Sequence, residues 1–145
     1  MRKLSILAVL AGGVVDVVSS VLLGIPFGIY ALFKVHAADI PKDQLPSAVA
    51  AVMHHGQIYF GEMLVGFACS VLGGYVAARL SGHDELLNGC LASFLCVALG
   101  VLALIAGKES DPIGQQIMFL IASPLLSLLG GFLRLKQRLA AAQAG

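Results

Sequence analysis

Residues 4–33 read LSILAVLAGGVVDVVSSVLLGIPFGIYALF, an almost unbroken apolar run with a single ionisable side chain, Asp16. As a helix this run would extend about 45 Å, which exceeds the bilayer hydrocarbon core of about 30 Å. Inserting an Asp at mid-membrane costs about 2.5 to 3.5 kcal/mol, whereas each Leu, Ile, Val or Phe contributes roughly −0.3 to −0.6 kcal/mol. The run contains about seventeen of these four residue types, so we predict that it spans a membrane.

One face of this run consists of small residues around the carboxylate. At a spacing of four it contains Ala8, Gly12, Asp16, Ser20, Gly24 and Gly28. A later apolar segment repeats the pattern with Glu62, Gly66, Ser70, Gly74 and Ala78. Residues four apart share a helix face, and small side chains let membrane helices approach closely. We therefore expect the two faces to pack together, with Asp16 pointing into the bundle.

The composition is that of a membrane domain. Hydrophobic residues make up 59% of the chain and charged residues 12%, and the mean hydropathy is +0.93. The net charge of +1 gives no basic or acidic excess that would indicate a nucleic-acid partner. We predict one all-α domain over 1–145, a polytopic integral membrane protein folded as a four-transmembrane-helix bundle. Its spans are expected at about 4–33, 58–80, 86–107 and 113–133.

The connections between these spans differ in length. The link at 81–85 is short, so the second and third spans should be antiparallel neighbours. The loop at 34–57 is longer, and its part 47–57 is either an interfacial helix or an extension of the second span. The third span is expected to be one packing helix, and Pro124 to kink the fourth.

The basic residues predict the orientation, because Lys and Arg near membrane spans are held in the cytoplasm. On one side lie Arg2, Lys3, Arg79, Arg134, Lys136 and Arg138, and on the other Lys34, Lys42 and Lys108. Both termini, including the basic tail 134–145, are therefore expected in the cytoplasm, with the loop 34–57 outside it.

The segment Gly73-Gly74-Tyr75-Val76-Ala77-Ala78-Arg79, followed by Leu86-Leu87-Asn88-Gly89, resembles a pattern in uncharacterised four-span bacterial membrane proteins. The resemblance covers about seventeen residues and implies the bacterial inner membrane, with no known activity. That pattern often has His-Gly where this chain has Asn88-Gly89. Gly12, Gly13 and Asp16 are also loosely similar to the first span of small multidrug resistance transporters, which carry Glu, shorter loops and a nearby tryptophan.

The sequence offers few groups for metal or covalent chemistry. Cys69, Cys90 and Cys96 lie inside apolar segments, where we interpret them as core residues. Their spacing matches no zinc motif, and no nucleophile-base constellation or phosphate loop is present. We therefore predict no metal, no cofactor and no enzymatic activity.

Two carboxylates are expected within the hydrocarbon, and such groups are functional by default because they are costly to retain. Asp16 is either a proton or ligand site or a packing group bonded through Ser20 or Ser70. Glu62 lies near the end of its span, so it either acts with Asp16 or snorkels to the interface. His55 shares a helix face with Glu62 if the second helix begins early; otherwise it is a solvated loop residue.

These observations favour a structural or partner-binding helix bundle in the lipid bilayer. Its expected partners are a second copy of the chain or another membrane protein, contacted through the small-residue faces. Within the bundle we assign helix packing to Gly12, Ser20, Gly24, Gly28, Gly66, Ser70 and Gly74. The alternative is a small proton-coupled transporter or channel that uses Asp16, with or without Glu62.

Overall fold

The structure, a computed structural model, describes residues 4–38, 40–54, 56–106 and 113–144. All regular elements in these ranges are helices: α1 Ile6–Ala37, α2 Leu45–Met53, α3 Gly56–Ser81, α4 Glu85–Ala92, α5 Phe94–Ala106 and α6 Ile113–Ala144. Four stretches are long and apolar enough to cross a membrane: Ile6–His36, Gly56–Ser81, Glu85–Leu102 and Gln116–Gln143. The predicted all-α bundle is confirmed, and the protein is a multi-pass membrane protein.

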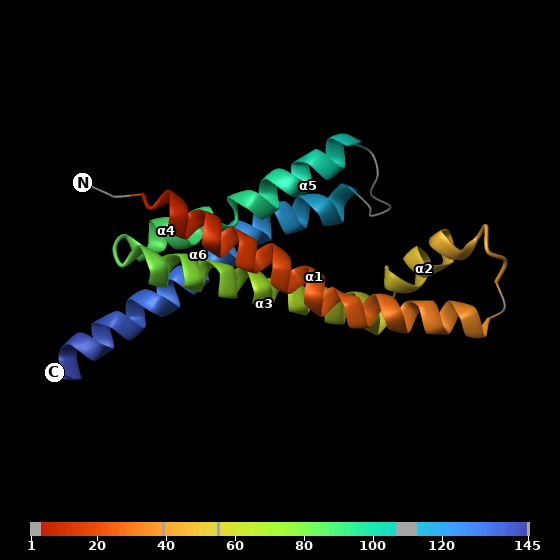
Figure 1. Cartoon of the computed structure of the whole chain (residues 1–145), viewed down its shortest axis with the longest axis horizontal. Coiled ribbons are helices and arrows are strands. Elements are labelled where there is room, and N and C mark those ends of the chain that lie inside the picture. Colours follow the sequence, from red (N-terminus) through yellow and green to blue (C-terminus); the bar gives the residue numbers. More distant parts are fainter. Residues whose placement is uncertain (1–3, 39, 55, 107–112, 145) are drawn as a thin grey trace.

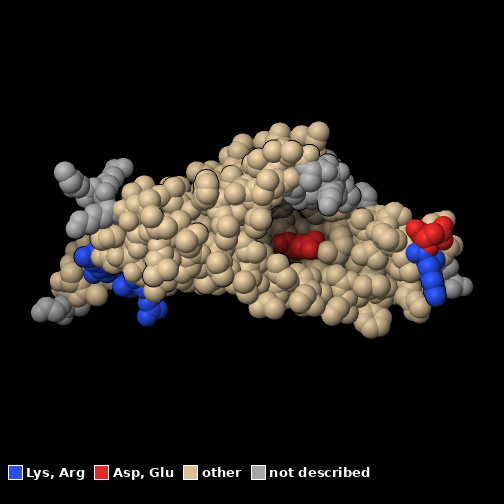
Figure 2. Space-filling view, turned by 45° about the horizontal axis from the view of Figure 1, so that its top comes forward, with Lys and Arg blue, Asp and Glu red and all other residues tan. Residues whose placement is uncertain are grey.

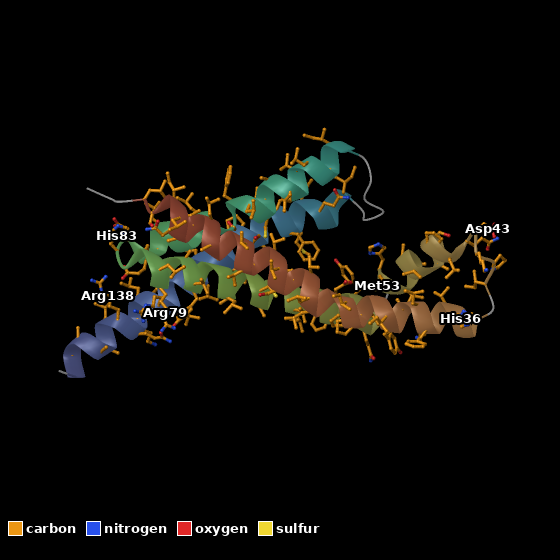
Figure 3. The ribbon with its side chains drawn as sticks, in the orientation of Figure 1. His36, Asp43, Met53, Arg79, His83 and Arg138 are labelled. Atoms are coloured by element: carbon orange, nitrogen blue, oxygen red, sulfur yellow. The ribbon has the colours of Figure 1, made fainter. Side chains whose placement is uncertain are left out.

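The four spans alternate in direction, so the beginning of α1 and the end of α6 lie at the same end of the bundle (Figure 1). Arg79, His83 and Arg138 lie at this termini end, and His36, Asp43 and Met53 at the opposite, loop end (Figure 3). Lys and Arg side chains gather at the two ends of the visible surface, and the long belt between them shows no Lys or Arg (Figure 2). Large apolar side chains such as Leu7, Val21 and Leu125 are exposed along this belt, as contact with lipid requires.

Glycines bring the helices together at the termini end. We call Gly12, Gly73, Gly74, Gly89, Gly130 and Gly131 the glycine cluster. A Cβ atom added at Gly89 would lie 2.7 Å from the Cα of Gly131, and one added at Gly73 would lie 2.8 Å from the Cβ of Asp16. Such distances leave no room for a side chain, so backbone packs on backbone.

The third span is not one continuous helix, which corrects the sequence-based expectation. It is interrupted at Ser93, between α4 and α5. In a continuous helix the Ser93 N–H would donate to the Gly89 carbonyl, but the Ser127 hydroxyl of α6 donates to that oxygen at 2.6 Å. The Ser93 N–H and hydroxyl both donate to the Cys90 carbonyl instead, at 3.4 and 2.9 Å. The break lets α5 diverge from α1 beyond this point (Figure 1).

Two other segments differ in extent from the predicted ranges. Residues 45–53 form a separate helix, α2, which folds back beside the end of α1 (Figure 1). Gly56, with a positive φ of 71°, begins α3, so α2 is not an extension of the second span. At the other end α6 continues as helix through Ala144, beyond the predicted limit near Leu133. Pro124 lies inside α6 and cannot donate a hydrogen bond to the Leu120 carbonyl.

Candidate functional site

Asp16 is buried at the centre of the bundle, with 1% of its surface exposed. The Ser70 hydroxyl of α3 donates to its two carboxylate oxygens, at 3.2 Å to Oδ2 and 3.4 Å to Oδ1. The Cys96 thiol of α5 donates to Oδ2 at 3.2 Å. The carboxyl group therefore joins three of the four spans, through donors that are weak or long compared with a usual hydroxyl–carboxylate bond of about 2.6 Å.

Asp16 lies in the wall of a central cavity of about 290 Å³. All four spans contribute to this cavity, which begins where the glycine cluster ends. Its polar lining comes from Asp16, Ser20, Ser70, Cys96, Gln116 and Ser123. Its apolar lining comes from Gly66, Phe67, Val97, Gly100, Phe119 and Leu120. Asp16 is the one carboxyl group among the described lining residues, and no Lys, Arg or His of the described chain lines the cavity.

The cavity follows from the placement of small side chains. The glycine cluster fixes the helix separation at the termini end, and beyond it α5 and α6 diverge from α1 and α3. Gly66 has no atom within 4 Å of the position where its Cβ would lie. Gly100 faces only the Leu120 side chain, at 3.0 Å from such a Cβ. The space between the diverging spans is therefore left unfilled.

The predicted packing residues divide into two groups. Gly12 contacts α3 and α4, and Ser70 contacts Asp16, so these two positions join helices. Gly74 also packs tightly, but against the Ser127 backbone of α6. Its neighbour Gly73 is the residue that faces α1. The α3 face on α1 is thus shifted by one residue from the predicted stripe, because α3 packs against α6 as well as α1 and uses adjacent faces for the two.

Three other predicted packing glycines make no close helix contact. Gly24, Gly28 and Gly66 have nothing within 4 Å of their Cβ positions. Gly24 and Gly28 lie on α1 beyond the region where the spans converge, and Gly66 opens onto the cavity. Ser20, the remaining member of the predicted set, lines the cavity. Within the described residues, Gly24, Gly28 and Gly66 therefore do not bring helix backbones together, whereas the packing role of Ser20 stays a prediction.

Glu62 lines a second space, the loop-side pocket, of about 440 Å³ between α2, α3 and α6. His54, Tyr59, Met63 and Phe119 are among its other lining residues. Figure 2 shows the belt between the two basic ends hollowed near its middle, with Asp or Glu atoms at the floor of the hollow. The predicted partner His55 lies outside the described residues. The structure thus places Glu62 and Tyr59 in one pocket, and Gly66 in the adjoining cavity.

Sequence reasoning missed eight of the twelve described cavity residues, among them Cys96, Ser123 and Phe119. Cys96 was interpreted as a core residue, yet its thiol bonds to Asp16. Ser123, whose hydroxyl lies 3.4 Å from that of Ser70, and Phe119 were not singled out. No local pattern in the sequence marks Cys96 as a partner of Asp16, because their contact depends on how α5 packs against α1.

Among the described residues, no group of three or more His, Cys, Asp or Glu side chains is arranged to hold a metal ion. In comparisons with known proteins, the chain matches no family model, no curated protein and no solved structure. Functional reasoning therefore rests on the cavity itself.

Proposed function

We propose that the protein provides a pathway for protons or another small cation across the membrane, with Asp16 as the binding group. The observation that carries this proposal is a buried carboxyl in the wall of a cavity that all four spans line. A carboxyl used only for helix packing needs hydrogen-bond donors but no empty space beside it. Here the donors are long and the space is present, which favours the transporter or channel over the structural bundle.

The chemistry of the lining supports a cation rather than an anion. Asp16 supplies negative charge when ionised, and the hydroxyls of Ser70 and Ser123 can turn their oxygens toward a cation or donate to the carboxylate. No basic side chain of the described lining compensates the charge. A proton on Asp16 removes the cost of a buried anion, so exchange of a proton for a cation is the balanced cycle for this site.

The test is proton flux into liposomes that contain the purified protein and a pH-sensitive dye, driven by a potassium diffusion potential. We expect flux above that of empty liposomes, and flux at the empty level for Asp16→Asn, which keeps the size and one acceptor oxygen of the side chain. Asp43→Asn, in the exposed connection before α2, is the matched control and should be silent. Equal flux through wild type and Asp16→Asn would contradict the proposal.

A second candidate, the partner-binding bundle, is supported by the two open glycines of α1. Gly24 and Gly28 leave a small-residue surface that no described part of the chain covers, and such surfaces pack against other membrane helices. If a second copy binds there, Gly28→Leu should lower the fraction of dimers counted by single-molecule photobleaching in lipid vesicles. Leu22→Ala, at an exposed position on the opposite side of α1 from Gly24, is the control.

We place the protein in a bacterial inner membrane with both termini in the cytoplasm. The basic residues near Arg79 and Arg138 support this orientation, since they lie at the termini end (Figure 3).

A further inference from the structure

The central cavity and the loop-side pocket have one residue in common. Phe119 of α6 lines both spaces. Its ring also contacts that of Phe67 in α3, with centroids 5.8 Å apart and planes at 61°, an edge-to-face pair. Phe67 lines the central cavity, whereas Met63, one turn earlier in α3, lines the loop-side pocket. The boundary between the two spaces is therefore an apolar side-chain layer centred on Phe119.

One face of α3 leads from the first space to the second. Glu62, Gly66 and Ser70 are spaced by four, so they follow one another along the helix surface. Glu62 lines the loop-side pocket, Gly66 lines the central cavity, and Ser70 donates to Asp16. Gly66 carries no side chain, and nothing lies within 4 Å of the position where its Cβ would be. Among the described residues, the aromatic layer is therefore the one obstruction along this face between the carboxyl groups of Glu62 and Asp16.

The loop-side pocket also offers polar groups to an incoming ligand. The Tyr59 hydroxyl in its wall is buried and makes no hydrogen bond within the described residues. A buried hydroxyl left in this way is costly unless a water molecule or a ligand uses it. His54 and Glu62 line the same pocket, so hydrogen-bonding groups converge there.

We propose that the loop-side pocket is the entrance to the central cavity for a small cation, and that the Phe119 ring is the barrier between them. The inference rests on the proposed cation pathway and names its route. Glu62 attracts the cation into the entrance, and rotation of Phe119 away from Phe67 joins the entrance to the cavity. Asp16 then receives the cation at the inner end of the α3 face.

The test measures access to a thiol placed at position 66, in a background with Cys69, Cys90 and Cys96 replaced by alanine. Gly66→Cys is suitable because its side chain enters open space. The protein is held in lipid nanodiscs, where both membrane faces meet the reagents. The probes are a cationic aminoethyl and an anionic sulfonatoethyl methanethiosulfonate, and mass spectrometry gives the labelling rate of each.

We expect Phe119→Ala to raise the rate of the cationic probe by about tenfold and Phe119→Trp to lower it. Phe94→Ala, an exposed ring on α5, is the matched control and should leave the rate unchanged. Glu62→Gln should lower the cationic rate severalfold and leave the anionic rate nearly unchanged, because the local attraction of cations is lost. The two Phe119 variants are predicted to act in opposite directions, so a general loss of folding cannot imitate the result.

The route is refuted if neither Phe119 variant changes the cationic rate, or if both probes respond alike to Glu62→Gln. Labelling needs no transport, so the two proposals fail separately. If flux requires Asp16 but the labelling rate does not change in the Phe119 variants, the proposed route is refuted and the proposed cation pathway is retained. If no flux is seen but the Phe119 variants change the labelling rate, the proposed cation pathway is refuted, and the loop-side pocket is the entrance to a binding cavity.

Discussion

Gly74→Ala should destabilise the bundle strongly, because the added Cβ would meet backbone rather than a movable side chain. The carbonyl oxygen, carbonyl carbon and Cα of Ser127 all lie within 3 Å of that position. Overpacking a core typically costs about 1 to 3 kcal/mol, and an obstacle of backbone places this site at the upper end. The helix preference of alanine over glycine returns about 1 kcal/mol, so the net loss is about 2 kcal/mol.

Gly66→Ala is the matched control on the same helix. Its Cβ meets nothing within 4 Å, so only the helix preference acts, and we expect a gain of about 1 kcal/mol. The free energy of unfolding is measured for both variants by titrating sodium dodecyl sulfate into mixed micelles and following helicity by circular dichroism. A difference of about 3 kcal/mol between the variants is expected. Equal stability of the two would refute the assignment of backbone contact to the glycine cluster.

Two further predictions concern the termini end. Arg138 donates to the buried Glu85 carboxylate at 2.5 Å, and the Arg138 side chain is 55% exposed, so Arg138→Gln should lower the free energy of unfolding by only about 1 kcal/mol in the same titration. The control Lys136→Gln should leave the free energy of unfolding unchanged, and equal losses in the two variants would count against the ion pair. Reporter fusions at Gly145 and within 34–57 should report opposite sides of the membrane, with Gly145 cytoplasmic, and signals from the same side would overturn the four-span topology.

Much of the fold was predictable from the sequence, because hydropathy and helix-face patterns are local. The spans follow from apolar runs, and the contact between Asp16 and Ser70 follows from two small-residue stripes. The sequence does not predict that Gly73, rather than Gly74, faces α1. Adjacent residues differ in direction by about 100° around a helix, and the sequence does not state which helix lies on which side. The stripe predicted one partner for α3, but α3 packs against α1, α4 and α6.

The break at Ser93 and the central cavity were not predictable for a different reason. The break depends on a hydrogen bond from Ser127 in another span, so nothing near Ser93 in the sequence marks it. The cavity is space left between four helices, and its volume depends on their relative angles as well as on the small residues Gly66 and Gly100. Asp16 could be identified as a candidate, whereas the thiol of Cys96 beside it required the tertiary arrangement.

The glycine cluster makes the two ends of the bundle differ in how fast they can open. At the glycine cluster the helices touch through their backbones, so opening there requires whole helices to separate on the microsecond-to-millisecond scale. At the loop end a ring at position 119 stands between two spaces, and side-chain rotation there is far faster. A solute that enters from the loop end would therefore reach Asp16 many times for each occasion on which the other end lets it leave.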